Sequence, residues 1–354
     1  MEAGDKGMST KLGRRTLIGV SIKGTDVTDD ANRYLLSLKY TDNEVDKADD
    51  LQLNLDDREG VWLNNWLDSD EGTKGAELSA AIIQKNWDSS GRDMELDCGI
   101  FQIDDLSGNG PPATVKIKGT SLPHQAAIRT ARQTRAWENI TLRGVSEEIA
   151  RRNGMKYMYE STFNPFYDRR EQVNLSDISF LQGLCNNAGI SLKASGGIII
   201  LFDAATYEQR PTVLTITKGK SNIHTYGFKT TLNDSNYARS KVVYTDPRTG
   251  HTLEYIFTPP GSDPDGQTYY INERTTNLDE ARNLAMRRLR QKNKGATKMN
   301  FTLDGDVRLL AGVTVNTRGF GMFSCKYIIE SATHNVGEGG YTTSIKLRRV
   351  LEGY

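Results

Sequence analysis

The chain has 354 residues, which is long enough for two or three domains with hydrophobic cores. Lys plus Arg and Asp plus Glu each number 45, so the overall charge indicates neither a nucleic-acid partner nor a membrane surface. With 37% apolar and 25% charged residues, no low-complexity tract, no bilayer-spanning apolar run and no signal-peptide core, the sequence is typical of an ordered soluble protein.

Cysteine and histidine, the usual zinc ligands, are few and scattered. Cys98, Cys185 and Cys325 lack the close spacing of a zinc site, so we expect buried, reduced thiols in a protein made in a cytoplasm. The histidines show no metal-binding spacing either: His124, His224, His251 and His334. The sequence therefore predicts no metal site and no cofactor.

Alternating apolar and polar residues predict a β-rich N-terminal third. The predicted strands occupy 16–23, 34–40, 50–55, 75–85 and 92–105. An acidic run connects the second strand to the third: Asp42, Glu44, Asp46, Asp49 and Asp50. Because this run lacks the regular ligand spacing and the distal bidentate glutamate of a calcium loop, we expect a solvated connection without metal.

The last of these strands contains an irregularity, because its apolar residues change phase near Gly99. Such a change predicts a β-bulge. The Gly- and Pro-rich segment 104–112 is expected to be a turn into a strand over 113–119. Asp104 and Asp105 are adjacent, so in a strand they would point to opposite faces, and we do not interpret them as a catalytic carboxylate pair.

The segment 121–137 carries Arg129, Arg132 and Arg135, which would form one basic stripe if the segment is helical. Bound phosphate is one interpretation of such a stripe. A solvated helix face or salt bridges between subunits are the commoner ones, since no aromatic residues are interleaved as in single-strand binders. A short helix is predicted from Ser146 to Gly154. Two aromatic-rich segments that follow are expected to be connections: 156–160 and 163–167.

The segment 172–203 predicts a capped helix and a β-hairpin, which form a compact middle domain. Ser176 is a suitable N-cap, and Gly189 can adopt the left-handed conformation that ends a helix. Between them the apolar residues at helical spacing form one stripe: Ile178, Leu181, Leu184, Cys185 and Ala188, flanked by Phe180. The hairpin strands are expected at 190–194 and 198–202.

The C-terminal third is again rich in predicted strands: 213–218, 224–231, 241–244, 251–257, 299–303, 312–316, 325–330 and 341–348. Asn277 and Glu280 resemble a capping box at the start of a long helix over 278–293. Its apolar stripe is predicted from Leu278, Ala281, Ala285 and Leu289. Its wet side is predicted from Arg282, Arg287, Arg288 and Arg290, which could face nucleic acid or simply complement the helix dipole.

The two β-rich thirds share a weak internal repeat. A strand that begins at Cys98, a glycine-rich turn and a Val-x-Ile strand are echoed by a strand from Cys325, a turn at 337–340 and a strand through Ile345. Two similar β domains in one chain mean that three copies would present six similar barrels around a ring.

Several motifs in this order resemble the phage late control D family, the baseplate hub proteins of contractile tails, which are related to the N-terminal part of VgrG spike proteins. The central motif is Gln172, Ser176, Asp177, Phe180 and Leu181, followed by Gly189. Matching positions before it are Gly99, Phe101, Ile103, Asp104, Gly110, Pro111, Pro112, Trp137, Asn139, Thr141, Leu142 and Gly154. Matching positions after it are Ala311, Gly312, Gly319, Phe320, Gly321, Tyr327, Ile328, Ile329, His334, Tyr341 and Thr343.

The resemblance implies an α+β, mainly β fold, in which two tube-protein-like antiparallel β-barrel domains (1–120 and 211–354) flank a small α+β domain (121–210). It implies a homotrimeric structural hub that joins the hexameric tail tube to a separately encoded central spike and surrounds a channel. Other baseplate wedge proteins and the tape measure protein are further expected partners. DNA is expected only as cargo. The expected location is the virion, after synthesis in the host cytoplasm, without a membrane anchor.

Two other classes of protein stay open from the residues alone. A β-rich cell-wall glycan hydrolase could assemble its catalytic residues from distant segments, although the chain has no Gly-x-Ser-x-Gly elbow and no phosphate loop. A glycan-binding tail protein would suit the 15 tyrosines, but tyrosine in strands more often serves packing or interfaces. We predict no enzymatic activity and therefore no catalytic residue.

Overall fold

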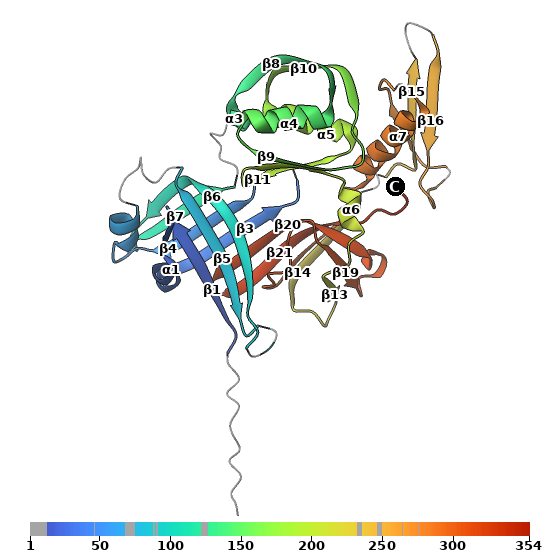
Figure 1. The fold of residues 1–354 in the computed structure, drawn as a ribbon. Coiled ribbons are helices and arrows are strands. Elements are labelled where there is room, and N and C mark those ends of the chain that lie inside the picture. The colour runs from blue at the N-terminus through green and yellow to red at the C-terminus, as the bar shows by residue number, and fades with distance from the viewer. Residues whose placement is uncertain are drawn as a thin grey trace, which may run out of the picture.

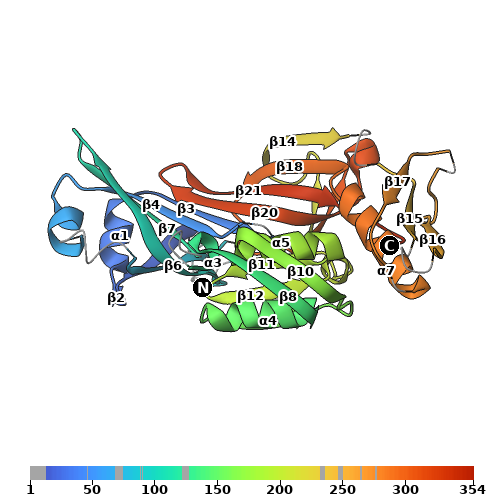
Figure 2. The same ribbon diagram turned by 90° about the horizontal axis from the view of Figure 1, so that it is seen from above.

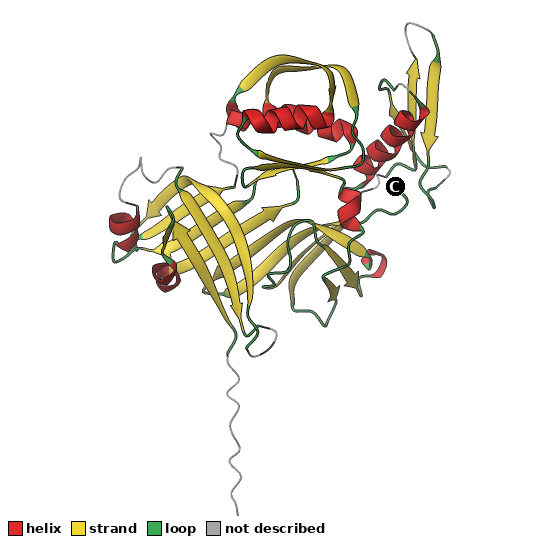
Figure 3. Ribbon diagram, in the orientation of Figure 1, coloured by secondary structure: helices red, strands yellow, loops and turns green. Residues whose placement is uncertain are grey.

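The computed structural model describes residues 13–354 except 46, 68–74, 88, 90, 122–126, 232–235, 246–249, 264 and 276. Most of the described residues that lie in regular structure are in strands, with a few helices, which confirms the α+β, mainly β class (Figure 3). The strands form one large sheet and three small ones, arranged as an elongated base with two smaller units on it (Figure 1).

The base of the molecule is a 13-stranded sheet among the described residues, in the order β14-β18-β21-β20-β3-β4-β7-β6-β5-β1-β2, with β19 and β13 attached beside β20. Its N-terminal β unit comprises β1 (Arg15–Ile22), β2 (Thr25–Asp26), β3 (Leu35–Asn43), β4 (Asp50–Asp56), β5 (Glu77–Lys85), β6 (Met94–Asn109) and β7 (Thr114–Thr120), with α1 (Thr28–Tyr34) and the π-helix η1 (Trp62–Trp66). Its C-terminal β unit comprises β13 (Leu214–Thr217), β14 (Ile223–Thr230), β18 (Thr297–Asp304), β19 (Thr314–Arg318), the 3-10 helix η2 (Gly321–Phe323), β20 (Lys326–Gly337) and β21 (Gly340–Arg349).

The two β units are joined by antiparallel pairing of β3 with β20, so one sheet runs through both (Figure 2). Each unit nevertheless has its own apolar core: Leu53, Ile82 and Phe101 belong to the first, and Phe301 and Ile329 to the second. The β-bulge predicted near Gly99 is confirmed, because the pairing of β5 with β6 shifts there and Gly99 has a φ of 89°.

The middle unit lies on this base as an arch over two helices (Figure 1). It comprises α3 (Ala127–Thr130), β8 (Arg132–Thr141), α4 (Leu142–Arg152), β9 (Lys156–Glu160), β10 (Phe166–Ser176), α5 (Asp177–Ala188), β11 (Ser191–Ser195), β12 (Ile198–Phe202) and α6 (Ala204–Glu208). The strands β8 and β10 pair above the helices, and β11, β12 and β9 form a sheet below them.

A small satellite sheet lies between β14 and β18 in the sequence. It consists of β15 (Arg239–Thr245), β16 (Thr252–Phe257) and β17 (Thr268–Ile271), and α7 (Leu278–Asn293) packs on one of its faces. The capping box of α7 is confirmed in part, because the Asn277 side chain accepts a hydrogen bond from the Glu280 backbone. Leu278 was expected in the buried stripe, but it is 60% exposed, and Leu284 is buried instead.

Several predicted boundaries in and near the middle unit are wrong. The three arginines do not share a helix, because α3 contains only Arg129, and Arg132 and Arg135 lie in β8. The helix α4 begins four residues before Ser146, where Thr141 is the N-cap. The strand β6 runs through most of the expected turn at 104–112. The two aromatic-rich connections are in fact β9 and the start of β10.

The helix α5 has the caps that the sequence predicts. The Ser176 hydroxyl accepts from the Ser179 amide at 3.4 Å, and Gly189 ends the helix in the left-handed conformation with a φ of 65°. A Cβ atom on Gly189 would lie 2.6 Å from Cβ of Arg287 in α7, so the glycine is also needed for the close approach of two helices.

We expect Gly189→Ala to lower the free energy of unfolding by about 2 kcal/mol or more, because it combines left-handed strain with a clash against α7. Urea denaturation would measure the change. Gly183→Ala in the same helix is the matched control, because a Cβ there meets nothing within 4 Å. It should be stabilising by about 0.5–1 kcal/mol. Equal effects of the two substitutions would contradict the expectation.

The internal repeat is present in the strand pairing. The strand order β3-β4-β7-β6-β5 of the N-terminal unit matches β14-β18-β21-β20-β19 of the C-terminal unit. Both units also skip a residue at the same two places. In the first place, the pairing of β6 with β7 skips Asp104, and the equivalent pairing of β20 with β21 skips Glu330. In the second, the pairing of β3 with β4 skips Leu36, and the equivalent pairing of β14 with β18 skips His224. The two units are therefore matched strand by strand.

Candidate functional site

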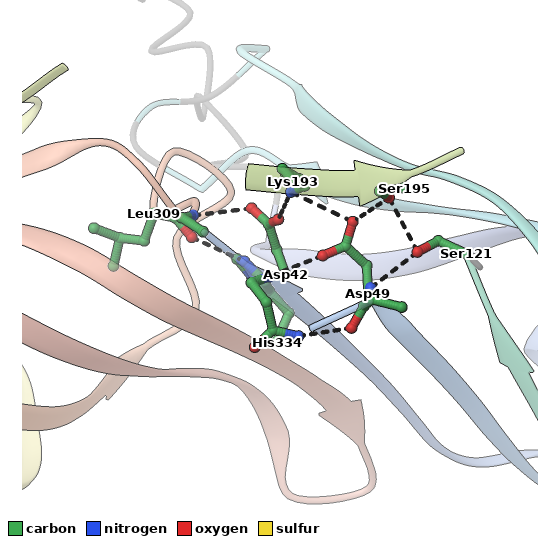
Figure 4. Close-up of polar contacts among 10 residues, drawn as sticks. Asp42, Asp49, Ser121, Lys193, Ser195, Leu309 and His334 are labelled. Carbon is green, nitrogen blue, oxygen red and sulfur yellow. Dashed lines mark hydrogen bonds and ion pairs between the residues drawn. The ribbon is translucent and has the colours of Figure 1, made fainter. Parts of the chain in front are cut away.

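The acidic run between β3 and β4 is not, for the most part, the solvated connection that the sequence predicts. Asp42, Glu44 and Asp49 are each no more than 7% exposed, and Asn43 beside them is 8% exposed. Asp50 is exposed, and Asp46 lies outside the described residues. The buried residues lie where the N-terminal β unit meets the middle unit and the C-terminal β unit, as their contacts with Lys193, Ala311 and Arg348 show, and Figure 4 shows Asp42 and Asp49 there. The interunit junction built around them is the candidate functional site.

The first part of the junction is a lysine between two aspartates (Figure 4). Lys193 on β11 places Nζ 2.9 Å from Asp42 Oδ1 and 3.4 Å from Asp49 Oδ2. Asp49 also accepts from the Ser195 hydroxyl at 2.7 Å. Asp42 accepts from the Ala311 amide at 2.9 Å, so this cluster connects all three parts of the chain.

The cluster holds two carboxylates for one ammonium, and the pKa values of Asp42 and Lys193 are both raised within it. Burial raises the pKa of Asp42, an effect that Lys193 opposes and Asp49 reinforces. Burial alone would lower the pKa of Lys193, but the attraction of the two carboxylates outweighs it and the pKa is raised. Lys193 therefore stays charged, and its positive charge is needed to keep both carboxylates inside the protein.

The loop between β18 and β19, which belongs to the C-terminal unit, is held from both sides beside this cluster. His334 Nε2 donates to the Leu309 carbonyl at 3.0 Å, and His334 Nδ1 accepts from the Tyr341 hydroxyl at 2.7 Å. On the side of the N-terminal unit, Gln84 donates to the Gly305 carbonyl at 2.9 Å. Side chains of this loop enter both apolar cores, so the loop holds the two β units together.

We expect the protein to lose stability as the pH falls from about 6.5 to about 4, in part through His334. Burial lowers the pKa of His334 from 6.5 to about 4, so the unfolded chain takes up the proton first. The free energy of unfolding should fall by up to about 3 kcal/mol across this range through this residue. Urea denaturation at several pH values would measure it. His334→Asn should have lower stability at pH 7 and a flatter profile; an unchanged slope would contradict the assignment.

The second part of the junction is a buried arginine on β21. Arg348, with 2% of its side chain exposed, places Nη2 2.9 Å from Glu44 Oε1 and donates from Nη1 to Glu208 at the end of α6. Burial would raise the pKa of Glu208, but Arg348 and then Arg290 outweigh that effect and the pKa is lowered. Arg348 therefore links the N-terminal unit, the end of the middle unit and the C-terminal unit by buried charge.

Of the four arginines predicted on the wet side of α7, Arg282 is exposed as expected, but the other three form ion pairs within the protein. Arg287 forms a paired contact with Asp203, with Nη1–Oδ1 at 2.6 Å and Nη2–Oδ2 at 3.3 Å. Arg290 Nη2 lies 2.6 Å from Glu208 Oε2, in an ion pair that is not aligned as a hydrogen bond. Arg288 pairs with Glu273 next to the satellite sheet. Most of the basic side of α7 thus binds the protein itself.

The cysteines are free thiols, and the possible metal ligands of the described residues do not form a metal site. Cys98 and Cys185 are buried and Cys325 is half-buried, and burial raises the pKa of the Cys98 thiol. Within the described part of the chain, no three His, Cys, Asp or Glu side chains are grouped so that they could hold a metal ion. None of its helices is both long enough and apolar enough to cross a bilayer.

A cleft of about 550 Å³ lies between β10 and the start of α7, lined by Phe163, Phe166, Tyr167 and neighbouring residues. Two of its carboxylates are engaged by arginines, Asp168 by Arg274 and Glu273 by Arg288. These two carboxylates of the cleft are therefore held by side chains of the protein itself.

Comparisons with known proteins agree on one family. The model of the family "phage tail baseplate hub (GPD)" matches residues 122–340. A probable baseplate hub protein of Escherichia phage 186 is 22% identical over 93% of this chain and 91% of its own length.

Solved structures share the fold at low identity. The 43 kDa tail protein of prophage MuSo2 from Shewanella oneidensis has a TM-score of 0.67 at 13% identity, covering 95% of this chain and 99% of its own. The type VI secretion component c3393 of E. coli has a TM-score of 0.54 at 12% identity, covering 95% of this chain and 78% of its own.

Proposed function

Because the chain belongs to the phage tail baseplate hub (GPD) family and is thus a component of the virion's tail, we propose that it acts as a homotrimeric adaptor between the tail tube and the central spike. The observation that carries this proposal is the internal repeat. Because each chain holds two β units with matched strand order and matched bulges, three chains present six similar units to a hexameric tube.

We propose that the hub performs no catalysis and that its interunit junction fixes the angle between the units. The buried charges at Asp42, Lys193 and Arg348 support a rigid arrangement, since each would be left unpaired by a small rotation of one unit. The domains are proposed as 1–120, 121–210 and 211–354. Three apolar cores follow this division for most of their residues, although Val307, Val336 and Tyr341 of the C-terminal domain also pack in the first core.

The remaining partners are proposed on the family relationship. They are the tail tube protein, the central spike protein, the wedge proteins of the baseplate and the tape measure protein. The trimer would surround a channel through which DNA passes as cargo. The hub protein itself would be synthesised and assembled in the host cytoplasm.

The solution mass of the purified chain, measured by light scattering with and without its tube protein, tests the proposal. A trimer, or a monomer that becomes a trimer when tube or spike is added, is the expected result. A stable monomer that does not associate when tube protein or spike is added would overturn the proposal. Release of reducing ends from cell-wall glycan, or capture of a surface glycan by the isolated chain, would point to the hydrolase or to the glycan-binding protein instead.

A further inference from the structure

The strand β14 is an open edge of the large sheet. Among the described residues it pairs only with β18. It is eight residues long, contains no proline, and leaves Tyr226 and Phe228 43% and 55% exposed. Proteins usually shorten, charge or cover such an edge, because its free backbone groups and apolar side chains can pair with another strand. An uncovered edge of this kind is available for pairing with a strand of another chain.

The internal repeat indicates which strand that is. The counterpart of β14 is β3, as both the strand order and the bulges at Leu36 and His224 show. The free edge of β3 is covered within the chain by β20, through the pairs from Ser331–Asn43 to Gly337–Ser37. The counterpart of β20 is β6. If the contact between the N-terminal and the C-terminal unit, in which β3 pairs with β20, is repeated between two chains, β14 of one copy is covered by β6 of the next.

The strand β6 has a free edge in the required place. Its residues from Gln102 to Asn109 pair with β7, whereas its pairing with β5 ends at Gln102. The backbone of Ile103 still bonds to Gly75 and Ala76, and beyond it that side of β6 carries no strand among the described residues. The corresponding side of β20, beyond its own short pairing with β19, is the side that β3 occupies.

We propose that β14 of one copy pairs antiparallel with residues 105–109 of β6 in a second copy of this chain, in the register of β3 with β20. The matched bulges set this register, so Ser107 lies opposite Lys229 and Gly108 opposite Phe228. These pairs correspond to Thr333 with Thr41 and His334 with Tyr40 within the chain.

The side chains suit this register. Gly108 has no side chain, so it leaves room for the exposed ring of Phe228, where the intrachain counterpart stacks Tyr40 on His334 at 5.9 Å. The contact is head-to-tail, because it joins two different edges. A repeated head-to-tail contact closes into a ring when its rotation closes, as it does in the proposed homotrimer. The inference rests on the proposed homotrimer and names the strands that form its subunit contact.

Cysteine cross-linking tests the pairing in the full chain, in a Cys325→Ser background because Cys325 is the half-buried native thiol. The test variant is Ser107→Cys with Lys229→Cys. The matched control is Thr41→Cys with Thr333→Cys, the equivalent pair within one chain, whose hydroxyl oxygens are 3.2 Å apart. After mild oxidation, the test variant should run as covalent dimers and trimers without reductant. Each single variant should stay monomeric, and a mixture of the two should give dimers only.

The outcomes separate this inference from the proposed function. A trimer by light scattering that fails to cross-link, while the control pair closes within the chain, would overturn the β14–β6 contact and leave the trimer standing. Cross-linking of Lys229→Cys to Thr16→Cys on β1 instead would also overturn it, because Thr16 lies outside the short pairing of β1 with β2 at Ser21 and Ile22 and has no strand on that side among the described residues. A monomer that stays monomeric with tube protein would overturn both.

Discussion

Replacement of Arg348 by leucine is expected to lower the free energy of unfolding by about 3–5 kcal/mol, which is among the largest effects of a single substitution in this chain. Arg348 is 2% exposed and lies between Glu44 and Glu208, whose carboxylates are also buried. Without the guanidinium, Glu44 keeps a buried charge with no other cation of the described residues within ion-pair distance, whereas Glu208 retains Arg290. The loss therefore reflects an uncompensated charge more than the worth of the ion pair itself.

Urea denaturation followed by fluorescence would measure the Arg348 effect, and the shape of the curve carries a second expectation. Because Arg348 connects three parts of the chain, its loss should broaden the transition or split it as the units uncouple. Arg169→Leu is the matched control. Arg169 pairs with Glu138 and Glu171 but is 59% exposed, so its replacement should change stability by about 1 kcal/mol or less.

A second control separates charge from shape. Glu44→Gln combined with Arg348→Leu removes the uncompensated carboxylate, so the double variant should recover part of the stability that the single variant loses. If Arg348→Leu behaves like Arg169→Leu, then Arg348 does not hold the junction and the rigid arrangement proposed for the hub loses its main support.

The elements that the sequence predicts well are those whose signals are local. The caps of α5 at Ser176 and Gly189 follow from residue types beside one helix, and the bulge at Gly99 follows from a phase change within one strand. The strands β8 and β10 were missed because they form a two-stranded arch with mostly exposed side chains, which leaves little apolar alternation to detect.

The junction could not be predicted because the partners of its charges are far away in the sequence. Asp42 meets Lys193 from the middle unit, and Glu44 meets Arg348 from the last strand. One signal was present: Asp42 continues the buried alternation of Leu38 and Tyr40, so its position in β3 indicated burial. A buried carboxylate requires a cation, but nothing local in the sequence identifies which one.

Replacement of Lys193 by methionine is expected to cost about 3–5 kcal/mol of stability at pH 7, because it leaves Asp42 and Asp49 buried together without the ammonium between them. The loss should shrink at lower pH. The pKa of Asp42 is already raised by burial, and the removal of Lys193 would raise it further. A carboxyl group whose pKa is raised on folding favours the folded state below its unfolded pKa and loses that contribution as the pH rises.

Asp42→Asn is the partner substitution that decides the cause of this effect. In the double variant Lys193→Met with Asp42→Asn, one carboxylate remains, and Asp49 keeps its bonds from the Ser195 hydroxyl and the Asn43 amide. We therefore expect the double variant to be more stable than Lys193→Met alone at pH 7, with a coupling energy of about 1–3 kcal/mol in the double-mutant cycle. Additive losses, or a Lys193→Met variant whose deficit is the same at pH 5 and pH 8, would show that Lys193 contributes packing and not charge.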